Sequence, residues 1–165
     1  MIKAIFATDL NGGMGYQGSL PWPHCRDDFL WFKQHTLNQI VIMGRNTWDD
    51  PKMPKPLPNR ICYVITSRII PNPPVSQLCG EYVDTIRNIQ RNSPEKDVFI
   101  IGGPKIILDC LDLIEEIYLT TFRGQYKIDT KIDLSLVLKK FELVSTDHKS
   151  DCTHLIYKKH ANIPK

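Results

Sequence analysis

Short apolar runs rich in β-branched residues recur along this chain, and they restrict its possible folds more than any other pattern does. Several are apolar at almost every position, which is typical of parallel strands that are covered on both faces. The runs are Ile2–Thr8, Ile40–Met43, Ile61–Thr66, Val98–Ile101, Ile117–Thr121 and Thr153–Tyr157. Each is therefore predicted to be a β-strand.

Helical segments are predicted between these strands, at Arg26–Leu37, Asp84–Gln90 and Pro104–Leu111. The alternation predicts a three-layer α/β fold, in which a mainly parallel mixed sheet has helices on both faces. No helix separates Phe141–Ser145 from Leu155–Tyr157, so these segments are expected to form an antiparallel hairpin at the C-terminal edge of the sheet. The proline clusters Pro51–Pro58 and Pro71–Pro74 are expected to be loops.

The length of 165 residues predicts a single domain over residues 1–165. A formal net charge of +3 is too small for a nucleic-acid-binding surface. No apolar run approaches the roughly 20 residues that a membrane span needs. The five cysteines are scattered and the five histidines lack metal-ligand spacing, so we expect free thiols, a cytoplasmic protein and no metal site.

One predicted helix combines an acid with aromatic residues. Asp28, Trp31, Phe32 and His35 fall at positions i, i+3, i+4 and i+7, and therefore share one helix face. The helix dipole alone explains Asp27, which lies on a different face. Asp28 loses solvation on an apolar face, which makes it a candidate for promoting proton transfer to a ligand.

Three further segments are candidates for binding an anionic ligand. Gly102 and Gly103 stand between a strand and a helix, where the backbone can approach a phosphate closely. Arg45 and Arg68 follow other strands, beside hydroxyl residues that also suit a phosphate. The glycine-rich loop 11–19 is a candidate lid. Taken singly, the loop is equally explained as a flexible turn, and each arginine is better explained as a solvated surface charge. The joint placement of the arginines favours an anion site.

Together these residues resemble the dihydrofolate reductase family over about Ile2 to Tyr157, with the family's motifs in the same order. The motifs are Ala7, Met14-Gly15, Leu20-Pro21-Trp22, Asp28 ahead of Trp31-Phe32, Met43-Gly44-Arg45-Asn46-Thr47-Trp48, Leu57-Pro58-Asn59-Arg60, Thr66-Ser67-Arg68, Ile101-Gly102-Gly103, Tyr118-Leu119-Thr120 and Asp129-Thr130. The resemblance implies a monomeric enzyme that reduces 7,8-dihydrofolate to tetrahydrofolate with NADPH. Hydride would pass to C6 of the pterin while N5 gains a proton.

The resemblance also implies roles for individual residues. Asp28 would promote the protonation of N5, Trp22 would hold a water beside it, and Leu20 would belong with Gly15 and Ser19 to a lid that Asp129 steadies. The residues expected to bind the substrate are Ile5, Ala7, Asp28, Phe32, Leu57, Arg60, Ile101 and Thr120, with Arg60 on the glutamate carboxylate and Thr120 on Asp28. Those expected to bind NADPH are Ala7, Gly15, Ser19, Gly44, Arg45, Asn46, Thr47, Thr66, Ser67, Arg68, Ile101, Gly102, Gly103, Pro104, Lys105 and Ile106.

The chain also departs from the family's pattern. Ile107 stands where a tyrosine is common, Asp50 where a serine is usual, and Pro104 where a small residue follows the glycine pair. The Gly102-Gly103 peptide bond is expected to be cis. Counting from Trp22 with a shorter loop would select Asp27 as the acid, whereas counting from Trp31 and the shared helix face select Asp28.

Two other functions are compatible with the same fold. A pyrimidine reductase of riboflavin synthesis can carry a similar Gly-Gly-Pro turn, but it is not expected to combine Asp28-x-x-Trp-Phe with the Met-Gly-Arg-x-Thr-Trp motif. A non-catalytic binding or assembly subunit is the second alternative. The joint presence of the acid, the lid and the arginines favours a dihydrofolate reductase over this subunit.

Overall fold

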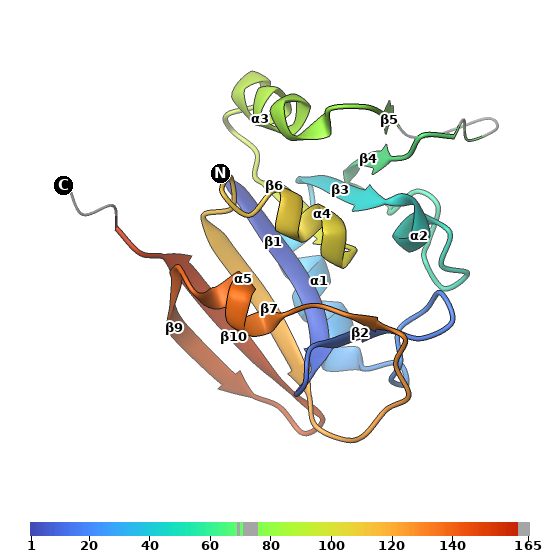
Figure 1. The fold of residues 1–165 in the computed structure, drawn as a ribbon, viewed down its shortest axis with the longest axis vertical. Coiled ribbons are helices and arrows are strands. Elements are labelled where there is room, and N and C mark those ends of the chain that lie inside the picture. Colours follow the sequence, from blue (N-terminus) through green and yellow to red (C-terminus); the bar gives the residue numbers. More distant parts are fainter. Residues whose placement is uncertain (69, 71–75, 162–165) are drawn as a thin grey trace.

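An eight-stranded sheet runs through the molecule in the computed structural model, which describes residues 1–68, 70 and 76–161 (Figure 1). The strands follow the order β5-β4-β3-β6-β1-β7-β10-β9. Their bounds are β1 (Ile2–Asp9), β3 (Ile40–Gly44), β4 (Ile61–Ile65), β5 (Ser76–Leu78), β6 (Val98–Gly102), β7 (Glu116–Phe122), β9 (Phe141–His148) and β10 (Cys152–Lys159). Pairing is parallel from β5 to β7, and β10 is antiparallel to both β7 and β9. The predicted mixed sheet and its C-terminal hairpin are confirmed.

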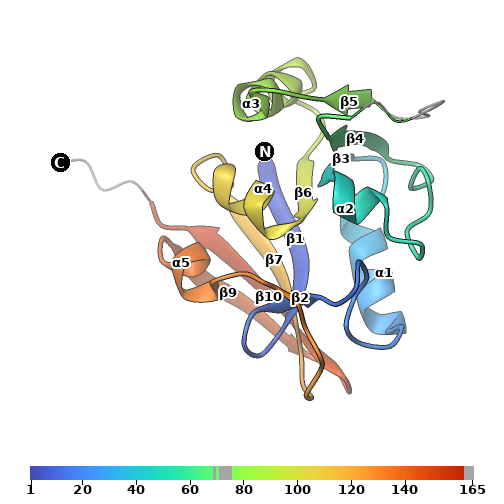
Figure 2. The same ribbon diagram turned by 45° about the vertical axis from the view of Figure 1, so that its right-hand side comes forward.

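Helices pack on both faces of this sheet, as predicted. They are α1 (Arg26–Thr36), α2 (Arg45–Trp48), α3 (Tyr82–Asn92), α4 (Pro104–Asp109) and α5 (Leu134–Leu138). In Figure 1, α4 lies in front of β1 and α1 lies behind it, and Figure 2 shows the same separation from the side. On the α4 face the core contains Ala4, Ile100 and Ile107, and on the α1 face it contains Ile5 and Phe99.

Several elements were not predicted because, at two to five residues each, they are too short to show a periodic apolar pattern. A second, two-stranded sheet pairs β2 (Gly13–Gly15) with β8 (Thr130–Lys131), so part of the predicted glycine-rich loop is a strand. The elements β5, α2 and α5 are also additions. Helix α4 ends at Asp109 rather than at Leu111, because Cys110 leaves the helical conformation.

The proline clusters and the cysteines can also be compared with the predictions from the sequence. Residues 51–58 form turns without a helix or strand, as predicted, whereas Pro71–Pro74 lies outside the described residues. All five cysteines are free thiols. Within residues 1–68, 70 and 76–161, no helix combines the length and the apolar character needed to cross a bilayer. In the same residues no group of three or more His, Cys, Asp or Glu side chains is arranged to hold a metal ion.

Candidate active site

A large cavity opens where β3, β4 and β6 reach their C-terminal ends. Its volume is about 1210 Å³. Ligands of open α/β sheets collect at this edge, because the loops that follow the strands diverge there. All of the residues predicted to bind NADPH line this one cavity: Ala7, Gly15, Ser19, Gly44, Arg45, Asn46, Thr47, Thr66, Ser67, Arg68, Ile101, Gly102, Gly103, Pro104, Lys105 and Ile106.

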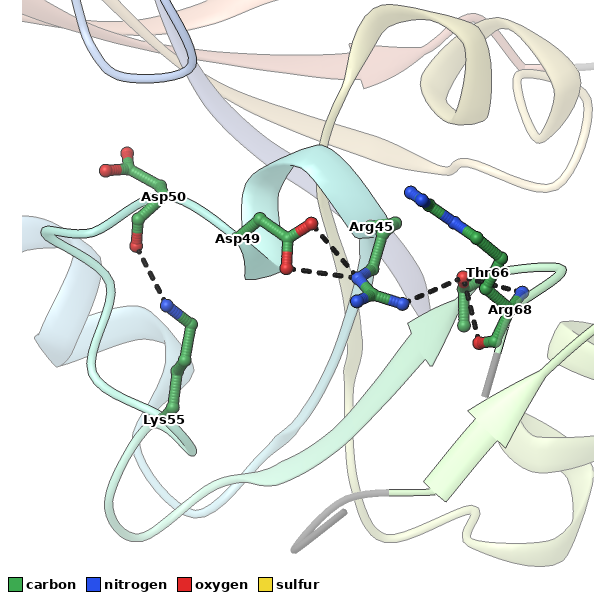
Figure 3. A network of polar contacts seen from close by, with 6 residues as sticks. All are labelled: Arg45, Asp49, Asp50, Lys55, Thr66 and Arg68. Atoms are coloured by element: carbon green, nitrogen blue, oxygen red, sulfur yellow. Dashed lines mark hydrogen bonds and ion pairs between the residues drawn. The ribbon is translucent and has the colours of Figure 1, made fainter. Parts of the chain in front are cut away.

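The side chain of Arg45 is held in place at the wall of this cavity. Its Nε donates to both carboxylate oxygens of Asp49, at 3.0 and 3.1 Å, and its Nη1 lies 3.5 Å from Oγ1 of Thr66. The backbone N–H of Arg68 donates to the same hydroxyl at 3.2 Å. Figure 3 shows both arginine side chains beside α2 and the end of β4. The local structure therefore presents two guanidinium groups at the same edge of the sheet, one after β3 and one after β4.

The cations of the cavity differ in how far they are already neutralised. Arg45 pairs with Asp49, and Lys105 pairs with Asp109 at 2.8 Å, each one turn along its own helix. Tyr82 also hydrogen-bonds to Asp109. Arg68 has no ion pair with any carboxylate in the described part of the chain. Its charge is therefore the most available of the three for an anionic ligand.

The predicted lid is attached to two neighbouring segments. Ser19 Oγ donates to Oδ1 of Asp50 at 3.1 Å, and the backbone N–H of Gln17 donates to Oδ2 of Asp129 at 2.8 Å. The N–H of Asp129 donates in turn to the carbonyl of Gly15 at 2.9 Å. Leu20 lines the cavity and is exposed. Asp129 thus contacts the lid where the resemblance placed it, and Asp50 adds a second attachment.

Asp28 lies on α1, and its side chain points toward the sheet. The hydroxyl of Thr120 on β7 donates to Oδ1 of Asp28 at 2.6 Å, as the resemblance implied. The side chain is 21% exposed. Thr120 is the register partner of Ala7 on β1, and Ala7 lines the cavity. The acid is therefore bonded to the strand next to the one that carries Ala7, and it is Asp28 rather than Asp27 that hydrogen-bonds to the sheet.

The apolar residues predicted to bind the substrate lie near this acid. Phe32 and Ile101 pack against both the cluster that contains Ile5 and the cluster that contains Leu57, so they join the two clusters. Arg60 lies over Phe32, with its Cζ 5.7 Å from the ring centroid. These contacts place a cation at one end of an apolar surface.

Arg60 and Trp22 are both fixed by their neighbours. Nε of Arg60 donates to Oγ1 of Thr36 at 3.1 Å, and Nη1 donates to the carbonyl of Pro58 at 2.8 Å. Burial lowers the pKa of the Arg60 guanidinium, which stays charged because guanidinium groups are not deprotonated in proteins. Trp22 is buried and stacks on Phe122 with ring centroids 4.3 Å apart.

Some features of the site were not predicted or differ from expectation. Cys79, Gly80 and Tyr82 also line the cavity, and they could not be predicted because the strand before them, β5, is only three residues long. Ile107 lies in the core rather than at the cavity wall. The Gly102-Gly103 peptide bond is cis, as the resemblance implied. His154, for which the sequence predicted no role, lies against Asp28.

Comparisons with known proteins agree with this arrangement. The family model for dihydrofolate reductase matches residues 1–161. Dihydrofolate reductase type 8 of Escherichia coli is 31% identical over 163 residues, covering 96% of this chain and 95% of that protein. Dihydrofolate reductase of Bacillus subtilis is 33% identical over 132 residues, covering 78% of this chain and 73% of that protein.

A solved structure shows that the fold is shared. Dihydrofolate reductase from Enterococcus faecalis, complexed with NADP(H) and RAB-propyl, superposes with a TM-score of 0.78 at 24% identity, covering 98% of this chain and 97% of that one. The family model and the curated relatives match the sequence over most of its length, so they establish the family as well as the fold. The chain therefore belongs to the dihydrofolate reductase family.

Proposed function

We propose that this protein reduces 7,8-dihydrofolate to 5,6,7,8-tetrahydrofolate with NADPH. One observation carries the proposal: the carboxylate of Asp28 is bonded to Thr120, whose register partner Ala7 lines the large cavity. A proton-directing group and a cavity that suits a dinucleotide are thus adjacent. Hydride transfer with protonation of the same ring needs both.

The cavity has the properties that NADPH requires. Apart from Gly103 itself and its two chain neighbours, no atom of the described residues lies within 4 Å of the position where Gly103 would carry a Cβ atom, so its backbone faces open space. Arg45, Arg68 and Lys105 supply positive charge for the phosphates. When bound there, NADPH supplies the hydride for C6 of the pterin. The lid residues Ser19 and Leu20 would cover the reacting rings and exclude water.

The residues around Asp28 would bind and polarise the substrate. The carboxylate would accept hydrogen bonds from N–H groups of the pterin, and its charge would favour the protonation of N5 through a water beside Trp22. Ile5, Phe32 and Leu57 would enclose the rings in an apolar surface. Arg60 would bind the α-carboxylate of the glutamate tail, which a guanidinium can hold with two hydrogen bonds.

An absorbance assay of NADPH consumption tests this function. We expect consumption only when dihydrofolate is added, and inhibition of it by a diaminopyrimidine. Consumption that depends instead on a pyrimidine substrate would select the reductase of riboflavin synthesis. Folded protein that is inactive with every substrate would select a non-catalytic subunit.

We further propose that residues 1–165 form one domain that acts as a monomer in the cytoplasm. One chain supplies every residue that we assign to the substrate and the cofactor, so a second copy is not needed to complete the site. The five free thiols support a reducing compartment. Sedimentation analysis at micromolar concentration checks the oligomeric state.

Arg68→Ala is expected to narrow the preference for NADPH over NADH by about tenfold or more. A hydrogen bond to a charged group contributes about 1.5–3 kcal/mol, and 1.4 kcal/mol corresponds to a factor of ten. The ratio of kcat/KM for the two cofactors measures the effect. Arg87→Ala is the matched control, because Arg87 pairs with Asp84 on α3 and neither residue lines the cavity. An unchanged ratio in Arg68→Ala would assign phosphate recognition to Arg45 or Lys105.

A further inference from the structure

His154 stands beside the acid of the site without belonging to the residues assigned above. It lies on β10 and is the register partner of Thr120, so both side chains point to the α1 face of the sheet. Its side chain is only 2% exposed, and its Nε2 lies 3.5 Å from Oδ1 of Asp28. The imidazole stacks on Trp31 with centroids 4.2 Å apart and an interplanar angle of 2°. The ring is therefore fixed with one nitrogen directed at the carboxylate.

The surroundings of the two ring nitrogens favour one tautomer. Nδ1 is buried and has no hydrogen-bond partner in the described part of the chain, whereas Nε2 faces Asp28 and the sulfur of Cys152 at 3.7 Å. A proton on Nδ1 would leave an N–H group unpaired and would turn the lone pair of Nε2 toward a carboxylate oxygen. A proton on Nε2 directs the N–H at that oxygen and leaves only a lone pair unsatisfied.

Thr120 and His154 approach the same oxygen of Asp28. The hydroxyl of Thr120 donates to Oδ1 at 2.6 Å, and the Nε2–H tautomer of His154 would add a second, longer contact. The distance of 3.5 Å between Nε2 of His154 and Oδ1 of Asp28 is longer than that of a strong hydrogen bond. Hydrogen bonds at active sites commonly shorten when substrate binds. Two donors on Oδ1 leave Oδ2 to receive the N–H groups of a pterin.

We propose that His154 is a positioning residue for the reduction: together with Thr120 it orients Asp28 through Oδ1 and stabilises the carboxylate in its ionised form. This inference rests on the proposed function for its effect on activity, but the contact itself does not depend on any substrate. The residue differs from the lid and the arginines, because it would act only through Asp28.

Other titratable groups surround Asp28 and His154. Burial raises the pKa of the Cys152 thiol to about 12, so this thiol stays neutral near physiological pH. Burial, Lys3 and His154 itself lower the pKa of His35, which stands at right angles to Trp31. Burial raises the pKa of Tyr118, which packs against His35. The remaining ionisable neighbours are Cys25 and Asp27 on the α1 side, Lys3 on β1 with its partners Asp97 and Glu116, and Asp147 opposite His154 on β9.

Removal of the imidazole is expected to change the pH dependence of the reaction. A carboxylate that loses a donor or a nearby positive charge binds its proton more tightly, so its protonation moves to higher pH. In the wild-type protein the ionised form should therefore persist to lower pH than in a variant without the imidazole. The acid limb of the pH dependence of kcat/KM should follow the same shift, because that limb reports groups of the free enzyme.

Titration of the Asp28 carboxyl carbon by ¹³C NMR tests the proposal directly. We expect His154→Phe, which keeps a ring to stack on Trp31, to raise the titration midpoint by about one pH unit. His154→Gln, which restores a neutral N–H donor, should recover part of this shift. His35→Gln is the matched control, because His35 lies in the same aromatic cluster without a hydrogen bond or ion pair to Asp28, and it should move the midpoint by much less than His154→Phe does.

Coincident midpoints in the wild-type protein and His154→Phe would overturn the proposal, even if kcat fell, because a purely structural role would alter packing alone. If His154→Phe does not fold, ¹⁵N NMR of the wild-type imidazole decides the matter. A proton on Nε2 supports the proposal and a proton on Nδ1 contradicts it. If the protein failed to reduce dihydrofolate, the proposed function would be wrong, while these NMR measurements would still test the contact.

Discussion

Asp28→Asn is expected to lower kcat for dihydrofolate reduction by about 10²–10⁴-fold at neutral pH, which is the usual contribution of a positioned acid or base. Asparagine has nearly the same shape and can still accept a hydrogen bond from Thr120 at the position of Oδ1. The substitution removes the negative charge and replaces Oδ2, the acceptor for the pterin N–H groups, by an NH2 donor, so the protein can no longer favour protonation of the pterin. Steady-state kinetics measure the loss.

NADPH binding should survive this substitution. Asp28 does not line the large cavity, so a fluorescence titration with NADPH should give a similar dissociation constant for the wild-type protein and for Asp28→Asn. Asp27→Asn is the matched control, because it changes the same charge one residue away on a different helix face. Greater damage from Asp27→Asn would show that the acid has been assigned to the wrong residue.

The central strands and the main helices could be predicted because their signals are local. A strand that is buried on both faces must be apolar throughout, and Ile40–Met43 and Val98–Ile101 satisfy that condition. By contrast, β2 and β8 pair with each other and contribute a single apolar side chain, Met14, to the core. Their sequences therefore contain nothing that separates them from loops.

The part of the candidate site that lies on a single helix could be predicted from the sequence. The helical spacing of Asp28 and Phe32 placed the acid on the face that meets the sheet, and the structure brings it to Thr120. His154 could not be found in this way, because its contact with Asp28 depends on the pairing of β10 with β7 and the packing of α1 over both. Such contacts are set by tertiary structure and leave no pattern along the chain.

Gly12→Ala is expected to lower the free energy of unfolding by about 3 kcal/mol or more. Gly12 has a φ of +86°, and a Cβ atom there would lie 2.2 Å from the carbonyl oxygen of Ile132. The left-handed conformation costs an alanine about 1–2 kcal/mol, and overpacking adds about 1–3 kcal/mol. Because the clashing atom belongs to the backbone, the strain cannot be relieved by rotating a side chain. Urea unfolding at constant m value measures the change.

Gly18→Ala separates the two contributions. Gly18 also has a positive φ, +79°, but among the described residues nothing lies within 4 Å of the position of its Cβ. It should therefore lose only the conformational part, about 1–2 kcal/mol. The clash at Gly12 involves a residue that is already bonded to it, because the carbonyl of Gly12 accepts a hydrogen bond from the N–H of Ile132 at 2.9 Å. Both residues adjoin the paired strands β2 and β8, and β2 contains the lid residue Gly15. Equal losses in the two variants would mean that β8 moves away from β2 at little cost, and the lid would then not be anchored by this pair of strands.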